Sequence, residues 1–370
     1  MSPYRIRTEP RTCCPDCFAN SWLRDYVKEK SRETGTCGTC RRRRRPLLPV
    51  CDLVGPFANL LSYYTPLEDP YLESGGTLIE LIQWDWEVFR DDLVESGRAG
   101  ALLESIMHTD WDDDSGEFPL SAIDSYIPRS RRWYHDTLAD IWDRFCEQVI
   151  ENPTDDLQLC DSGFHEFVLN EDLLGRTTIY LSAGTTLYRA RLGFTIGPDN
   201  HPQPYSGPDI GPPPIAKATP GRANKSGRAV LYCADQEQTA IAEVRPVRGE
   251  YVSIAELYTL QELRIVDLST TPDWPNPFAT EHLSYEIEFS SLLEAFAEEL
   301  AKPLRRRDDV ADYLPSQKLA EFIEQAGIDG VRYPSAMAPD GTNIVLFNPL
   351  LVKIGPSKLV EISNIRIDYS

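Results

Sequence analysis

The chain has 370 residues, of which 41% are hydrophobic and 26% charged, and these values allow two or three packed domains. Its formal net charge of −21 argues against general affinity for DNA or RNA, because phosphate binding requires local cations. The sequence contains no run of eighteen apolar residues and does not begin with the apolar segment of a secretory signal. We therefore expect a soluble, cytoplasmic protein without a membrane span.

The charge is unevenly distributed along the chain. Residues 1–45 carry twelve Arg and Lys against five Asp and Glu, a balance near +7, so the remaining chain lies near −28. Five of these cations are the consecutive residues Arg41 to Arg45. Such a run contacts nucleic acid or an acidic partner in some proteins and is simply solvated in many others. Both interpretations stay open.

Five of the nine cysteines lie in the first 40 residues. Two CxxC knuckles, Cys14 to Cys17 and Cys37 to Cys40, are separated by 19 residues. Four thiolates at this spacing are typical of a closed, structural Zn²⁺ site, and Cys13 competes with Cys14 as a ligand. A redox pair or unbound thiols would leave about fifty residues with too little core to fold. The sequence therefore predicts structural Zn²⁺ bound by Cys14, Cys17, Cys37 and Cys40, and not a catalytic metal, because the module contains no His.

A helical pattern follows the cysteine-bearing module. Apolar residues recur at helical spacing at Leu78, Ile82, Trp86 and Phe89. Residues 99–107 and 133–149 show the same periodicity, and the second run ends before Asn152-Pro153. We expect three or four helices packed as a bundle.

Beyond residue 160 short strands alternate irregularly with helices, which predicts an α+β fold. A loop rich in Pro and Gly covers residues 197–227, and no glycine fingerprint of a Rossmann or P-loop site appears. The predicted strands are 186–190, 229–232, 263–268, 330–333, 343–347 and 359–368, and the predicted helices are 238–243, 290–300 and 315–325.

Three motifs of this C-terminal half occur together in a characteristic order. They are Leu187-Tyr188-Arg189-Ala190, then Gly221 to Gly227 continuing through Tyr232 to Arg245, and finally Gly330 to Ser335 with Gly341 to Phe347. Over roughly residues 165–355, their order and spacing resemble the RES family, the toxin half of RES–Xre toxin–antitoxin systems. The family is named for an Arg, a Glu and a Ser, which match Arg189, Glu243 and Ser335.

The resemblance implies an ADP-ribosyltransferase-like fold and consumption of NAD⁺, by hydrolysis or phosphorolysis or, in some members, by transfer to a protein. It also implies an Xre-type antitoxin or other regulatory protein as partner. The front of the chain is similar to the HEPN-like extension, with a cysteine knuckle, that precedes some RES domains. We therefore expect three parts: a zinc knuckle at 1–50, a helical module at 51–158 and a RES catalytic domain at 159–370. The long insertion between Arg189 and Arg222 departs from compact RES toxins.

Each expected site residue has a chemical role and an ordinary structural alternative. Glu243 would stabilise the oxocarbenium-like state on the ribose, and Arg189 and Arg222 would bind the pyrophosphate. Tyr232 would stack on the nicotinamide ring, and Ser335 would bond its amide or a ribose hydroxyl. Taken singly, the charged residues are also compatible with surface ion pairs, Tyr232 with a core position and Ser335 with a turn.

Two other functions compete with this hypothesis. Arg129 and His135 fit the arrangement of HEPN ribonucleases, in which a His and an Arg cleave RNA at a dimer interface. Alternatively, the zinc knuckle and the Arg run form a module for nucleic acid or a partner, with an inactive RES fold. The acceptor (water, phosphate or a protein side chain) and assembly as a homo-oligomer stay open.

Overall fold

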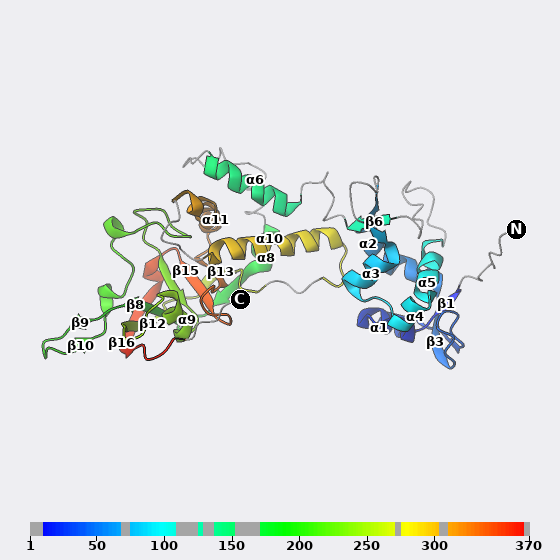
Figure 1. Ribbon diagram of the computed structural model, residues 1–370, viewed down its shortest axis with the longest axis horizontal. Helices are drawn as coiled ribbons and strands as arrows, with labels where there is room; N and C mark the ends of the chain where they lie inside the picture. The colour runs from blue at the N-terminus through cyan, green and yellow to red at the C-terminus, as the bar shows by residue number, and fades with distance from the viewer. Residues whose placement is uncertain are drawn as a thin grey trace. The chain divides into compact units, whose positions relative to one another are not determined.

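A computed structural model describes residues 10–67, 75–108, 125–128, 137–151, 171–270, 275–302 and 310–365 (Figure 1). The chain forms two compact units. The first comprises Met1–Thr137 and Asp273–Phe289, and the second comprises Leu138–Pro272 and Ser290–Ser370. Within the described residues, no helix combines the length and the apolar character that crossing a membrane requires.

The first unit begins with a small antiparallel sheet of order β1-β3-β2, and helix α1 follows the first knuckle. Asn20 caps α1, because its side chain accepts a hydrogen bond from the Leu23 backbone N–H. These elements are β1 (Thr12–Cys13), α1 (Ser21–Lys30), β2 (Glu33–Gly35) and β3 (Arg45–Pro49).

The described residues of the first unit also include four further helices, α2 to α5, and a second three-stranded sheet of order β4-β6-β5. The predicted apolar stripe is confirmed, since Leu78, Ile82 and Trp86 are the buried residues of α3 and Phe89 is buried just beyond its end. The sheet was not predicted, because strands of two to four residues are too short to show alternation. The elements are α2 (Val54–Ser62), β4 (Tyr64–Pro66), β5 (Gly76–Thr77), α3 (Leu78–Trp86), α4 (Asp91–Glu95), α5 (Arg98–Met107) and β6 (Ser125–Pro128).

The cysteine-bearing module and the helices of the first unit share one hydrophobic core. This core also contains Phe278, whose ring lies 5.2 Å from that of Phe57 and 6.0 Å from that of Trp22. The segment around Phe278 leads into helix α10 (Leu283–Ala301), which begins in the first unit and ends in the second. The predicted boundary near residue 50 therefore falls inside a continuous core, as expected of fifty residues that bury too little surface to fold alone.

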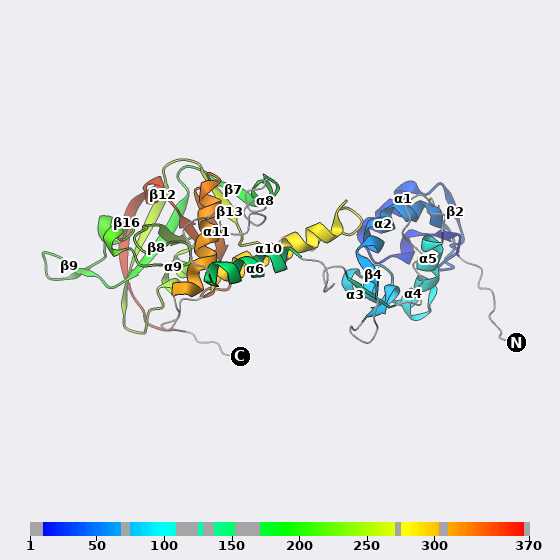
Figure 2. The ribbon, with the colours of Figure 1, turned by 90° about the horizontal axis from the view of Figure 1, so that it is seen from above.

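The second unit is built on an eight-stranded sheet of order β16-β12-β8-β11-β15-β14-β13-β7, which confirms an α+β fold. All neighbouring strands are antiparallel except β13 and β14, which helices α10 and α11 connect. The strands are β7 (Thr178–Leu181), β8 (Thr186–Leu192), β11 (Leu231–Ala234), β12 (Tyr251–Thr259), β13 (Leu263–Asp267), β14 (Gly330–Pro334), β15 (Thr342–Leu346) and β16 (Val352–Glu361). A separate hairpin of β9 (Thr195–Ile196) and β10 (Pro202–Gln203) projects from this sheet (Figure 2).

Strand β12 was missed by the sequence analysis, although it is central to the sheet. Its residues are largely buried on both faces, so the polar–apolar alternation of a half-exposed strand is weak. Strand β7 was missed as well. The other predicted strands and helices of this unit overlap elements of the structure, but two of them differ in their bounds by seven residues. The strand predicted at 359–368 overlaps β16 only at residues 359–361, and the helix predicted at 290–300 begins at Leu283. The helices are α8 (Glu171–Thr177), α9 (Glu237–Glu243) and α11 (Leu314–Gln325), besides α10.

The helix predicted near residues 133–149 is α6 (Leu138–Glu151), which packs beside α10 and α11 of the second unit (Figures 1 and 2). The rings of Trp142 and Phe296 lie 4.8 Å apart in an edge-to-face arrangement. Phe145 is fully buried, with its ring 5.8 Å from that of Phe322. The prediction that this helix joins a bundle with the earlier helices was therefore wrong. An apolar stripe predicts that one face of a helix is buried, but it does not identify the element against which that face packs.

Replacing Phe145 by Ala is expected to destabilise the second unit by about 3–5 kcal/mol, because it leaves a cavity between α6 and α11. Ile150, 45% exposed on the same helix, is the matched control, and Ile150→Ala is expected to change stability by less than about 1 kcal/mol. Equilibrium denaturation followed by circular dichroism measures both. Equal shifts of the two midpoints would place Phe145 outside the core.

Candidate functional site

A cavity of about 410 Å³ lies in the second unit and contains four of the five residues predicted to bind or cleave the substrate. Arg189 comes from β8, Tyr232 from β11, Glu243 from the end of α9, and Arg222 from the loop before β11. The volume falls within the range of small-molecule sites. The fifth residue, Ser335, follows β14 and is directly bonded to Glu243.

The register of the sheet explains why these segments meet. Tyr188, Ala234, Asn343 and Tyr333 are paired across the four adjacent strands β8, β11, β15 and β14. Helix α9 starts three residues after β11 and packs against β8, so its last residue lies close to this row.

A close approach between α9 and the turn before β15 brings Glu243 to its partners. A Cβ atom added to Gly341 would lie 2.0 Å from the Oγ1 atom of Thr239, so only glycine fits at this position. Thr239 is one helical turn before Glu243, and Gly341 is two residues before Asn343. The missing side chain therefore lets the two segments bond through Glu243 and Asn343.

The carboxylate of Glu243 receives two hydrogen bonds on the same oxygen. Ser335 Oγ donates to Glu243 Oε1 at 2.6 Å, and Asn343 Nδ2 donates to it at 2.7 Å. Ser335 Oγ also accepts from the backbone N–H groups of Met337 and Ala338, at 3.1 Å each. The one proton and both lone pairs of the hydroxyl are thus used within the protein. Among the described residues none donates to Glu243 Oε2, which can therefore bind a ligand.

Arg189 brings an uncompensated positive charge to the same cavity. Its Nε donates to the Ile210 carbonyl at 2.8 Å and its Nη1 donates to the Tyr232 carbonyl. Burial lowers the pKa of the guanidinium, and within the described ranges no carboxylate forms an ion pair with it. A half-buried cation without an acidic partner favours an anionic ligand. Ile210 belongs to the long insertion, so this insertion is bonded to the site.

Arg222 and Tyr232 have their polar ends bound by the protein. Arg222 Nη1 lies 3.2 Å from a carboxylate oxygen of Glu299, and both side chains are buried. Its guanidinium also lies 4.6 Å from the centre of the Tyr313 ring. Tyr232 Oη accepts from the Ala223 N–H at 3.0 Å and donates to Asn224 Oδ1 at 2.9 Å, and burial raises its pKa to about 12. Both residues therefore build the wall of the cavity in this structure.

Asn343 is a site residue that the sequence analysis did not identify as one. It was noted within the third motif without a role, although it donates to Glu243 across 100 residues of chain. No local pattern indicates such a pairing, because it depends on the register of β15 beside β14 and β11.

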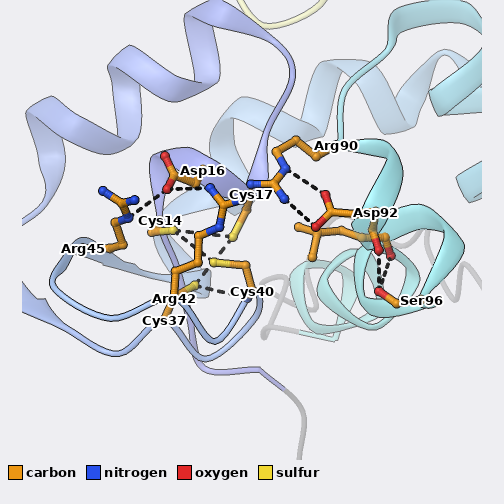
Figure 3. A network of polar contacts seen from close by, with 11 residues as sticks. Cys14, Asp16, Cys17, Cys37, Cys40, Arg42, Arg45, Arg90, Asp92 and Ser96 are labelled. Carbon is orange, nitrogen blue, oxygen red and sulfur yellow. Dashed lines mark hydrogen bonds and ion pairs between the residues drawn. The ribbon is translucent and has the colours of Figure 1, made fainter.

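The four predicted zinc ligands form a cluster in the first unit, in which the sulfur atoms of Cys14, Cys17, Cys37 and Cys40 all lie within 4.8 Å of one another (Figure 3). The Cys14–Cys40, Cys17–Cys37 and Cys14–Cys17 sulfur distances are 3.4, 3.6 and 3.9 Å. A tetrahedron with Zn–S bonds of about 2.3 Å requires sulfur separations of about 3.8 Å, so this donor set fits Zn²⁺. Of the two competing residues, Cys14 is the one within the cluster.

The residues of the suggested ribonuclease motif, Arg129 and His135, lie outside the described residues. The ribonuclease interpretation therefore stays a prediction. Asn152 and Pro153, which were expected to end the helix predicted at 133–149, also lie outside the described residues and directly follow Glu151, the last residue of α6.

Comparison with known proteins gives a family match and likenesses to solved structures. Residues 186–364 match the RES domain. The crystal structure of the M. tuberculosis MbcT–MbcA toxin–antitoxin complex is similar at 19% sequence identity, over 52% of this chain and 94% of that chain, with a TM-score of 0.29. That score is too low to establish a shared fold, so the ADP-ribosyltransferase-like fold stays a prediction. No curated protein matches the chain significantly. By its family match, the chain carries a RES domain at residues 186–364.

Proposed function

We propose that the RES domain cleaves the nicotinamide–ribose bond of NAD⁺. The observation that carries this proposal is the pairing, in one cavity, of an oriented carboxylate, Glu243, with the uncompensated cation of Arg189. NAD⁺ has complementary charges, because its pyrophosphate is anionic and positive charge develops on its ribose as the bond to nicotinamide breaks.

In the proposed reaction nicotinamide leaves with the bonding electrons, and the ribose acquires oxocarbenium character. Glu243 Oε2 bonds the ribose hydroxyls and stabilises this positive charge. Ser335 and Asn343 hold the carboxylate through Oε1, so it does not reorient during the reaction. Ser335 thus acts through Glu243 rather than on the nicotinamide amide.

Arg189 binds the pyrophosphate in this proposal. Its Nε and Nη1 donate to carbonyl groups, whereas Nη2 has no hydrogen-bond partner among the described residues and is left to bond a ligand oxygen. The charge of Arg222 is neutralised by the buried carboxylate of Glu299, so we assign it a structural role.

One of three acceptors then forms the new bond to the ribose carbon that nicotinamide has left. Water gives ADP-ribose, phosphate gives ADP-ribose-1″-phosphate, and a protein side chain gives an ADP-ribosylated target. The RES match supports a toxin or defence effector that consumes NAD⁺ and is restrained by an Xre-type antitoxin or another regulatory protein.

Purified protein incubated with NAD⁺, with and without phosphate, is expected to release nicotinamide, and chromatography coupled to mass spectrometry identifies the second product. Glu243→Gln is expected to lower the rate by about 10²–10³, the usual effect of removing a group that stabilises transition-state charge. Glu237→Gln is the control, because Glu237 lies on the same helix and pairs with Lys358 outside the cavity. Intact NAD⁺ with the wild-type protein, or an unchanged rate for Glu243→Gln, would refute the proposal.

Asn343→Leu is expected to lower kcat by about tenfold to hundredfold with a smaller change in KM, because one hydrogen bond to the charged carboxylate is lost. Steady-state kinetics with NAD⁺ measure both constants. A fall confined to KM would instead place Asn343 in direct contact with the substrate.

We further propose that Cys14, Cys17, Cys37 and Cys40 bind a structural Zn²⁺ that stabilises the first unit. The wild-type protein is expected to contain about one zinc per chain by elemental mass spectrometry. Cys37→Ser is expected to lose the metal and lower the melting temperature. Cys51→Ser, at an exposed cysteine, is expected to change neither. A wild-type protein free of zinc and insensitive to chelators would contradict this assignment.

A further inference from the structure

The five consecutive arginines that follow the second knuckle, Arg41 to Arg45, the last of which begins β3, have different contacts in the fold. Arg42 Nη1 and Arg45 Nε lie 3.0 and 2.8 Å from the same carboxylate oxygen of Asp16, within the first knuckle (Figure 3). These two ion pairs connect the two knuckles and give Arg42 and Arg45 a structural role.

The other three arginines, Arg41, Arg43 and Arg44, have no such role. Their side chains are exposed, and none forms an ion pair with a residue in the described parts of the chain. Neither the cavity of the second unit nor the core of the first uses them. We call these three residues the basic loop.

The backbone of the basic loop is strained and firmly held. Arg41 and Arg44 have φ values of +64° and +55°. These values lie in the left-handed region, and a residue other than glycine adopts it at a cost of about 1–2 kcal/mol. The Arg41 N–H donates to the Cys37 carbonyl at 3.1 Å, and the Cys37 N–H donates to the Arg42 carbonyl at 2.9 Å. At its far end, Arg45 pairs with Gly35 in the sheet. The three cations are therefore presented on a fixed scaffold, which lowers the entropy lost on binding.

We propose that the basic loop is a docking surface for the phosphate backbone of a nucleic acid. Guanidinium groups match phosphate oxygens in geometry and charge. Residues 1–45 carry a balance near +7 in a chain of −21, so the basic loop lies in the part of the sequence with the most favourable net charge for a polyanion. Four thiolates with Zn²⁺ would carry only two negative charges, fewer than the five arginines beside them.

The surroundings of the basic loop favour a nucleic acid over an acidic protein. Protein interfaces depend on a few buried aromatic or aliphatic anchors. Within the described part of the first unit, Trp84 on α3 is the one large hydrophobic residue recorded as strongly exposed, and it is not part of the loop. Charge without apolar anchors is typical of backbone phosphate binding.

Fluorescence anisotropy of the full chain with a labelled DNA duplex and a labelled single-stranded RNA tests the proposal, over salt from about 50 to about 200 mM. The loop variant carries Arg41→Ala, Arg43→Ala and Arg44→Ala. The control variant removes three cations elsewhere in the same unit, by Lys28→Ala, Lys30→Ala and Arg32→Ala. For duplex DNA, we expect the loop variant to reduce the slope of log affinity against log salt by about 3, with at least about a tenfold loss of affinity at low salt. The control is expected to lose less than about threefold.

Three outcomes would overturn the proposal: no binding of either nucleic acid by the wild-type chain, equal losses in both variants, or binding of a polyglutamate peptide in preference to nucleic acid. Circular dichroism spectra that match the wild type would show that both variants are folded. NAD⁺ turnover is expected to be equal in all three proteins, so this test is independent of the reaction proposed for the RES domain.

Discussion

The candidate active site depends on the two hydrogen bonds that Glu243 Oε1 receives from Ser335 and Asn343. A carboxylate at a partly enclosed surface requires donors, and here both come from segments about a hundred residues later in the chain. The bonds therefore join α9 to the end of β14 and to β15, and they require the close approach that Gly341 permits beside Thr239. Both bonds end on Oε1 and leave Oε2 without a donor among the described residues, so the contacts that join these segments also fix the carboxylate in the lining of the cavity.

Acidic partners separate the structural arginines from those that can bind ligands. Arg222 is buried with Glu299, and a buried cation of this kind stabilises the wall only while its partner is present. Arg189 has carbonyl groups as partners in the described structure and no carboxylate, so its charge still requires an anion. In the first unit Asp16 neutralises Arg42 and leaves Arg43 exposed. In the sequence all of these residues are simply arginines. Their roles are distinguished only by the position of the nearest carboxylate in the structure.

Much of the secondary structure could be predicted from the sequence, because apolar periodicity reports burial within one element. The α3 stripe, the two CxxC knuckles and the three motifs around Arg189, Glu243 and Ser335 all depend on local spacing. Partners of an element are set by contacts distant in sequence, and these were missed. Helix α6 belongs to the second unit, β12 is central to its sheet, and Asn343 bonds Glu243 across 100 residues. The metal cluster could be predicted from the sequence because its four cysteine ligands lie within one short stretch of the chain.

The two units are not consecutive modules of the chain, and this limits how their functions can be separated. The connection between β13 and β14 supplies Phe278, Leu283 and Ile287 to the core of the first unit. A chain that began after Thr137 would retain these three side chains without the core that buries them, and exposed apolar surface of this kind favours aggregation. Loss of activity in such a truncated protein would therefore not assign a catalytic role to the zinc module. Single substitutions that leave both cores intact, such as those at Glu243 and in the basic loop, separate the two functions because each changes charge at one surface only.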